Sequence, residues 1–151
     1  MLDDVDFQIL GVLQKNSRIT FSELGRSVNL SATAARNRIN SLVNRGIITK
    51  LGVDLDWSKI GWPIQSLLLV RTEHGKTELV AKQLQKIPQI LAITKTAGNV
   101  DLMLRLLASD VADFSSMLNK TFSKIQGIVS IDTLMILEEV NNTPPLPAQK
   151  E

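Results

Sequence analysis

Apolar residues recur at three- and four-residue intervals in three short stretches near the N-terminus, a spacing typical of amphipathic helices. The apolar positions are Leu2, Val5, Ile9 and Val12 or Leu13, then Leu24 and Val28, and then Ala35, Ile39 and Leu42. Thr20 and Glu23 form a capping-box pattern at the start of the second stretch, and Ser31 caps the third. Gly46 ends the third stretch. Residues 1–50 are therefore predicted to fold as a three-helix domain.

Beyond Gly46 the pattern changes to one that favours extended structure. Residues 47–56 are rich in β-forming residues and end in alternating apolar and acidic positions, which predicts a strand or a small hairpin beside the helices. Such a strand would form the wing of a winged helical domain. We assign residues 51–63 to this strand and a linker, because the Gly-Trp-Pro run at 61–63 marks a domain boundary.

The second half of the chain alternates between strand-like and helix-like segments. Strands are predicted over 64–73, 90–96, 102–108 and 129–137, and helices over 76–87 and between a cap at Asp110 and a stop at Gly127. The order βαββαβ places two helices on one face of an antiparallel, ferredoxin-like sheet, so the fold class is α+β. The other face is apolar and lacks helices, which favours association of two copies. Residues 64–140 are assigned to this domain, and the proline-rich stretch 141–151 to a flexible tail.

Composition excludes several classes of protein. The chain has 151 residues, no cysteine and a single histidine, His74, so neither a disulfide framework nor a thiolate or histidine-based metal site is expected. No run of 18 apolar residues is present, and the acidic start MLDDVDFQIL does not resemble a signal peptide. We therefore expect a cytoplasmic protein with no metal, no cofactor and no membrane partner.

Charge is unevenly distributed along the chain. The net charge is +2, but seven basic residues and one acid lie between Lys15 and Lys50, which gives this segment a net charge of +6. The remaining residues therefore carry −4. A basic patch confined to the three-helix domain is typical of a surface that contacts nucleic-acid phosphates.

Residues 20–46 read TFSELGRSVNLSATAARNRINSLVNRG, which predicts two short helices joined by a tight turn. This is the pattern of a helix-turn-helix motif, whose second helix lies in the major groove of double-stranded DNA. The outward face of that helix contains no acid, whereas an ordinary surface helix mixes both signs of charge. A surface helix of a small bundle stays open as the alternative from this stretch alone.

Amide, hydroxyl and guanidinium groups suit direct contact with base edges, because Asn pairs with adenine and Arg with guanine. We predict that the base contacts come from Thr33, Arg36, Asn37 and Asn40. We predict that the phosphate contacts come from Arg18, Ser31, Arg38, Arg45 and Lys50. A protein of this kind would act in the cytoplasm, associated with the nucleoid.

These features together resemble the Lrp/AsnC (feast/famine) family of transcriptional regulators. The opening LDDVDFQILGVLQKNSRITFSELGRSVNLSATAARNRINSLVNRGII is similar to that family's N-terminal helix-turn-helix. The βαββαβ half is similar to its effector-binding module, the ACT-like RAM domain, so the resemblance covers nearly the whole chain. It implies a dimer that commonly assembles to an octamer, pseudo-palindromic DNA sites, and a response to an amino acid or a related small metabolite.

In that family, the loop between the second and third strands of the module carries a Gly-acid-aromatic-Asp pattern. In the corresponding segment here Gly98 and Asp101 match, whereas Asn99 replaces the acid and Val100 replaces the aromatic residue. An acid would hold an α-ammonium group by charge, and an uncharged Asn cannot. The resemblance implies that an effector contacts Gly98, Asn99, Asp101 and, on the last strand, Thr133. A tight hairpin turn whose Asp bonds to the backbone would explain the same segment without any ligand.

Two other functions stay open. Relatives that use this architecture to decarboxylate haem precursors need acid–base groups, and a chain with one histidine and no tyrosine argues against such an enzyme. An architectural protein that binds DNA with little sequence preference is the second alternative, although the Asn- and Thr-bearing face argues for direct readout. Trp57 and Trp62 are expected to anchor the linker rather than to stack on nucleic acid.

Overall fold

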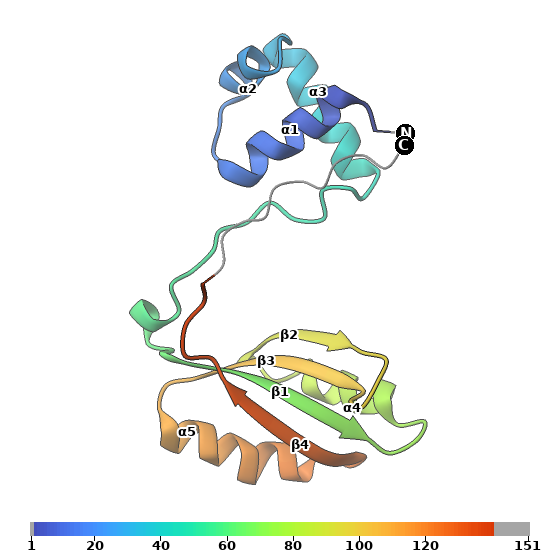
Figure 1. Ribbon diagram of the computed structural model, residues 1–151, viewed down its shortest axis with the longest axis vertical. Coiled ribbons are helices and arrows are strands. Elements are labelled where there is room, and N and C mark those ends of the chain that lie inside the picture. The colour runs from blue at the N-terminus through green and yellow to red at the C-terminus, as the bar shows by residue number, and fades with distance from the viewer. Residues whose placement is uncertain (1, 141–151) are drawn as a thin grey trace. The chain divides into compact units, whose positions relative to one another are not determined.

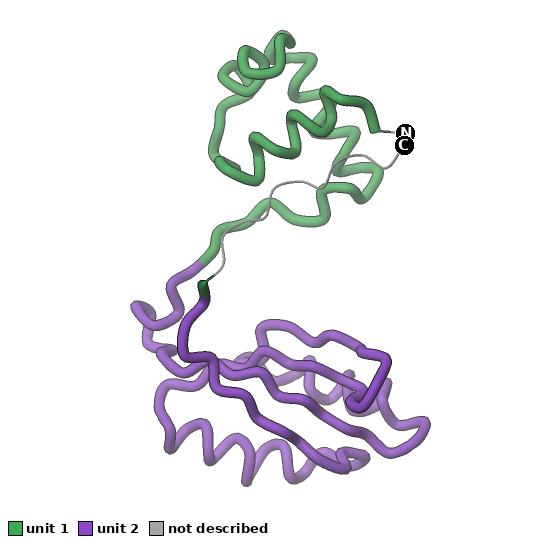
Figure 2. The backbone as a smooth tube through the Cα atoms, viewed as in Figure 1, with its two compact units in different colours: residues 1–54, 140–151 green, residues 55–139 purple. Residues whose placement is uncertain are grey.

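The computed structural model describes residues 2–140 and contains two compact units (Figures 1 and 2). The first, which we call the helical unit, holds the residues up to Asp54, and the second, the sheet unit, spans Leu55–Glu139. The break between the units lies inside the 51–63 segment assigned to a strand and a linker. The tail assigned to 141–151 lies outside the described residues.

Within the described residues, the helical unit contains α1 (Asp4–Lys15), α2 (Phe21–Ser27) and α3 (Ala32–Asn44). Their inward faces bury one apolar cluster, made of Ile9, Leu24, Val28, Ala35, Ile39 and Leu42. All six are among the positions at which the helical spacing predicted a core. The predicted caps also form, because Glu23 N donates to Thr20 Oγ1 at 3.2 Å and Ala34 N donates to Ser31 Oγ at 3.1 Å.

The turn between α2 and α3 is tight because of two residues. Asn29 adopts a φ of 56°, the left-handed conformation that Asn tolerates better than most residues. Gly25 lies so close to the turn that a Cβ there would be 2.6 Å from the backbone oxygen of Leu30. Leu30 N also donates to the carbonyl oxygen of Gly25 at 2.7 Å. The absence of a side chain at position 25 therefore sets how closely the turn follows α2.

The prediction of a strand or hairpin over 47–56 is wrong. The segment contains no strand, and a single 3-10 turn, η1 (Ser58–Ile60), follows it. The N–H groups of Ile47 and Ile48 instead both donate to the carbonyl oxygen of Leu42, at 2.9 and 3.2 Å. A strand needs a neighbour to satisfy its backbone groups, and the described part of the helical unit offers no second extended segment.

The sheet unit contains strands β1 (Ile64–Thr72), β2 (Ile90–Lys95), β3 (Leu102–Ala108) and β4 (Ile128–Met135), which form one antiparallel sheet in the order β2-β3-β1-β4. Helix α4 (Thr77–Leu84) follows β1, and α5 (Val111–Ser116), continued by a π turn and a 3-10 turn to Lys124, follows β3. The predicted βαββαβ order and α+β class are confirmed. Helix α4 ends three residues earlier than predicted, and Ala81 rather than Leu79 is buried.

The two faces of the sheet have different surroundings. One face packs against α4 and α5 around a core that includes Leu68, Val70, Val80, Leu84, Leu102, Leu104, Leu106, Met117 and Phe122. The strand register places alternate residues on the opposite face, among them the partly exposed Leu67, Leu69 and Met103. We call this second face the open face.

None of the described helices is long and apolar enough to cross a membrane.

Candidate DNA-binding surface and effector loop

Helix α3 presents one polar face to solvent. Ala35, Ile39 and Leu42 are buried along its other side. The four residues predicted to contact bases are spaced at i, i+3, i+4 and i+7, so they lie on one helix face, and all are exposed: Thr33, Arg36, Asn37 and Asn40. Helix α3 contains no acidic residue. Its exposed face can therefore approach a polyanion without repulsion from its own side chains.

Arg36 has a neighbour that the sequence analysis missed. Its guanidinium carbon lies 6.0 Å from the centroid of the Phe21 ring, at the outer limit of a cation–π contact. Phe21 is the first residue of α2 and is 43% exposed, so its ring lies at the surface. The two residues belong to different helices, and no local spacing rule would have paired them.

Arg38, one of the predicted phosphate contacts, is engaged inside the helical unit. Its Nη1 donates to Asp3 Oδ2 at 2.6 Å and to Asp6 Oδ1 at 2.8 Å. The hydrogen bond from Arg38 holds the pKa of Asp3 below its ordinary value, and the bonds to Asp3 and Asp6 raise the pKa of Arg38. The charge of Arg38 is thus balanced by acids at the start of α1, which argues against a phosphate contact.

Two further predicted phosphate contacts lie at the ends of α3. Ser31 is the N-cap, and its exposed hydroxyl can still donate to an anion at the positive end of the helix dipole. Arg45 is the C-cap residue, and its Nη1 lies 3.9 Å from Asp6 Oδ2. At a rise of 1.5 Å per residue, the two ends are about 21 Å apart. Ser31 and Arg45 would therefore contact different phosphates.

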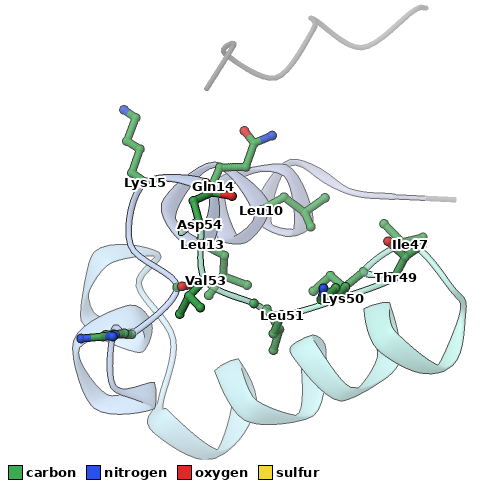
Figure 3. A pocket seen from close by; sticks show the side chains of 14 residues that line it. Leu10, Leu13, Gln14, Lys15, Ile47, Thr49, Lys50, Leu51, Val53 and Asp54 are labelled. Atoms are coloured by element: carbon green, nitrogen blue, oxygen red, sulfur yellow. The ribbon is translucent and has the colours of Figure 1, made fainter. Parts of the chain in front are cut away.

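A groove lies between α1 and the segment 47–54, with Lys50 in its lining (Figure 3). Arg18 also lines this groove. The groove has a volume of about 790 Å³. Its apolar lining includes Leu10, Leu13, Leu51 and Val53. Lys15 adds a third cation to the lining, against one acid, Asp54. The groove thus groups two predicted phosphate contacts, and none of the four predicted base contacts lines it.

In the loop between β2 and β3, Asp101 is bonded to the sheet. Its Oδ2 accepts from Thr72 N at 2.7 Å and from Thr72 Oγ1 at 3.1 Å, and its own N donates to Val70 O at 3.0 Å. These bonds fasten the loop to the end of β1. Asp101 therefore has a structural role that does not depend on any effector.

Gly98 and Asn99 lie at the exposed tip of this loop, where Gly98 adopts a φ of 147° that other residues rarely adopt. Thr133 is not beside them. It pairs with Leu68, four residues before Thr72 on β1, and this places it about 13 Å away along the strand direction. One chain alone therefore does not gather the four predicted effector residues into a single pocket.

The open face carries a charged residue that the sequence analysis also missed. Arg105 lies on β3 opposite Leu67, and its Nη2 donates to Gln65 Oε1 at 2.7 Å and to Glu139 Oε1 at 2.6 Å. Its Nε is buried and has no hydrogen-bond partner among the described residues. Arg105 thus introduces a charge into a largely apolar surface.

Two family models match the chain. Residues 2–49 match a winged helix-turn-helix DNA-binding domain, and residues 65–146 match the Lrp/AsnC ligand-binding domain. The chain belongs to the Lrp/AsnC family of transcriptional regulators. This Lrp/AsnC protein is a DNA-binding regulator with a ligand-binding domain and not an enzyme, which confirms the predicted family, fold class and general function.

Similar proteins match this Lrp/AsnC regulator over nearly its whole length. The HTH-type transcriptional regulator FL11 of Pyrococcus furiosus is 26% identical over 149 residues, which cover 99% of this chain and 98% of the relative. The DNA-binding transcriptional activator DecR of Escherichia coli is 24% identical over 152 residues, which cover 99% of this chain and 100% of the relative. A Neisseria meningitidis transcriptional regulator, solved in complex with L-Met, superposes with a TM-score of 0.89 at 27% identity over 97% of both chains.

Proposed function

We propose that this Lrp/AsnC regulator recognises particular DNA sequences through the exposed face of α3. The observation that carries the proposal is the single acid-free face shared by Thr33, Arg36, Asn37 and Asn40. Each of these side chains suits a base edge in the major groove: the amides pair with adenine, the guanidinium with guanine, and the hydroxyl with either. A protein that bound only the DNA backbone would gain little from amides at the centre of this face.

The phosphate contacts in this proposal come from Arg18, Ser31, Arg45 and Lys50. We leave Arg38 out, because its Nη1 donates to Asp3 and Asp6 at 2.6 and 2.8 Å, and we keep Arg45, whose Nη1 lies 3.9 Å from Asp6 Oδ2. Three neutralising cations per chain correspond to a slope of log K on log salt of about −2.7 for each bound chain. A second copy bound to the same site would double that slope.

The proposed regulator acts as a dimer that associates through the open face of the sheet. Leu67 and Leu69 are partly exposed on this face, and Leu134, opposite Leu67, is 53% exposed. The buried and unpaired Nε of Arg105 would gain an acceptor if a partner covered the face. A dimer would place two α3 helices about 34 Å apart, in successive major grooves.

The proposed effector is an amino acid. This class is favoured by the ligand-binding domain and by the relative from Neisseria meningitidis that was solved with L-Met. The tip of the loop offers the Asn99 amide in place of a carboxylate, so an α-ammonium group would be held by hydrogen bonds without a full opposite charge. Because one chain does not gather the four predicted effector residues, we propose that the effector binds between copies.

The deciding experiment is a selection of genomic DNA fragments by the purified full chain at near-physiological salt, with and without the twenty amino acids. We expect enrichment of a short pseudo-palindrome and a change in the enriched set when amino acids are present. Methionine, tested alone, is the first candidate for the active component. Enrichment of nothing beyond base composition would overturn the proposal and support an architectural role instead.

A further inference from the structure

We infer that Arg38 is a positioning residue, which together with Asp3 and Asp6 forms an ionic clamp that fixes the recognition helix α3 on α1. The inference rests on the proposed sequence-specific function of α3 and adds a residue to it. Arg38 would hold the base-contacting face in place without touching DNA. The clamp lies entirely within the helical unit.

In the clamp, both oxygens of each carboxylate accept a hydrogen bond. Asp3 is the N-cap of α1 and forms a reciprocal capping box with Asp6: Asp6 N donates to Asp3 Oδ1 at 2.8 Å, and Asp3 N donates to Asp6 Oδ2 at 3.3 Å. Arg38 Nη1 donates to the other oxygen of each carboxylate, Asp3 Oδ2 at 2.6 Å and Asp6 Oδ1 at 2.8 Å. Each acid therefore uses one oxygen to start α1 and the other to hold α3.

Burial strengthens the clamp at one of its two acids. The side chain of Asp6 is only 9% exposed, whereas those of Arg38 and Asp3 are 34% and 52% exposed. A nearly buried carboxylate without a counter-ion is costly, so α3 is held where its arginines can reach Asp6, Arg38 at 2.8 Å and Arg45 at 3.9 Å. The lowered pKa of Asp3, caused first by its hydrogen bond from Arg38, is consistent with this arrangement.

Positioning matters here because Arg38 directly follows Asn37 on α3. The core between the three helices is apolar, and apolar packing is not directional. Arg45 Nη1, at the end of α3, lies 3.9 Å from Asp6 Oδ2, a looser ionic contact to the same acid. Contacts with base edges require placement within about 0.5 Å and 10–20°. A pair of hydrogen-bonded carboxylates on a second helix supplies the direction that the apolar core lacks.

The clamp predicts an effect opposite in sign to simple electrostatics. Removing an acid from a DNA-binding domain should strengthen binding to phosphates. If Asp6 holds α3 in place, Asp6→Asn should instead weaken binding to the preferred sequence. Asp4→Asn is a matched control, because Asp4 is an exposed acid in the same helical turn and forms no ion pair among the described residues.

The test measures the affinity of the full chain for a selected fragment and for a scrambled fragment of equal length, over a range of salt concentrations. For Arg38→Gln and Asp6→Asn we expect the ratio of the two affinities to fall by roughly tenfold, comparable to the loss of one base contact. The salt slope should stay unchanged in both variants. Asp4→Asn should keep the wild-type ratio.

Two results would overturn the inference. If Arg38→Gln weakens both fragments equally and lowers the slope by about 0.9, Arg38 is a phosphate contact. If the affinity ratios of Arg38→Gln and Asp6→Asn equal that of the wild type, the ion pairs have no part in sequence reading.

A second measurement needs no DNA and separates failure of the clamp from failure of the proposed function. We expect Arg38→Gln and Asp6→Asn each to lower the Tm of the helical unit by roughly 4–8 °C. The double variant should lower it no further than the larger single effect, since both changes break one clamp. Additive shifts would show that the two residues act independently and would overturn the clamp. If the wild type shows no sequence preference but the two Tm shifts are coupled, the clamp exists and the proposed function of α3 is refuted.

Discussion

At the scale of single residues, Asn37 distinguishes base reading from backbone contact. It is exposed at the centre of the α3 face, where an amide can pair with adenine. Asn37→Ala should relax preference at particular base pairs, at a cost of about 1–3 kcal/mol in binding to the selected site. Competition binding with single-base variants of the site measures the preference at each base pair. Gln8→Ala, which removes an exposed amide from α1, is the control, and uniform weakening by Asn37→Ala would count against a base contact.

Gly25 is the residue at which a single added carbon should disturb the motif. A Cβ there would lie 2.6 Å from the Leu30 oxygen and 3.1 Å from two backbone atoms of Ser31, so the turn would have to move. We expect Gly25→Ala to destabilise the helical unit by about 1–3 kcal/mol, as other overpacked sites do. Hydrogen exchange of the α2 and α3 amides measures the loss of protection.

Gly52→Ala provides the control for that experiment. The atoms nearest to an added Cβ at position 52 belong to the flexible side chain of Lys50, at 3.2 Å and beyond, and can move aside. Protection should therefore stay at the wild-type level. Equal effects of the two substitutions would show that chain flexibility, rather than the close approach at Gly25, determines the result.

At the scale of elements, the β2–β3 loop can be divided into a structural and an effector-binding part. Asp101→Ala removes the bonds to Thr72 and should lower the Tm of the sheet unit even without ligand. Asn99→Ala, at the exposed tip, should leave that Tm unchanged and abolish the Tm increase caused by the effector. Thermal unfolding with and without amino acid tests both variants. If Asn99→Ala keeps the Tm increase caused by the effector, the tip of the loop is a turn and not part of the effector site.

Elements specified by residues close together in the sequence could be predicted. Elements that depend on contacts with distant segments of the chain could not. The caps at Thr20 and Ser31, and the βαββαβ order, follow from residues a few positions apart. The strand over 47–56 was wrong because strand propensity does not supply a neighbouring strand. Similarly, the spacing on α3 placed the base-contacting face, but it could not show that Arg38 finds its carboxylates more than thirty residues earlier in the chain.

At the scale of the whole molecule, the two proposed activities lie in different units. The face of α3 belongs entirely to the helical unit, and the β2–β3 loop belongs entirely to the sheet unit. An effector bound at the loop can change DNA binding only if it favours one assembly of the chains over another. The open face of the sheet is therefore where regulation and assembly would meet.

Leu134 tests that assembly. It is 53% exposed on the open face, whereas Val111, at the start of α5, is 70% exposed on the helical layer. Leu134→Glu would bury a carboxylate in the proposed interface, so we expect the dimer dissociation constant to rise by at least about 100-fold, or 2.7 kcal/mol. Val111→Glu adds the same charge away from the interface and should leave the dimer intact. Sedimentation velocity over a concentration series measures both dissociation constants.

Because two half-sites are read only by two linked α3 helices, Leu134→Glu should also lose the preference for paired half-sites over a single one. A stable dimer in Leu134→Glu would move the interface away from the open face, and the unpaired Nε of Arg105 would then need another explanation.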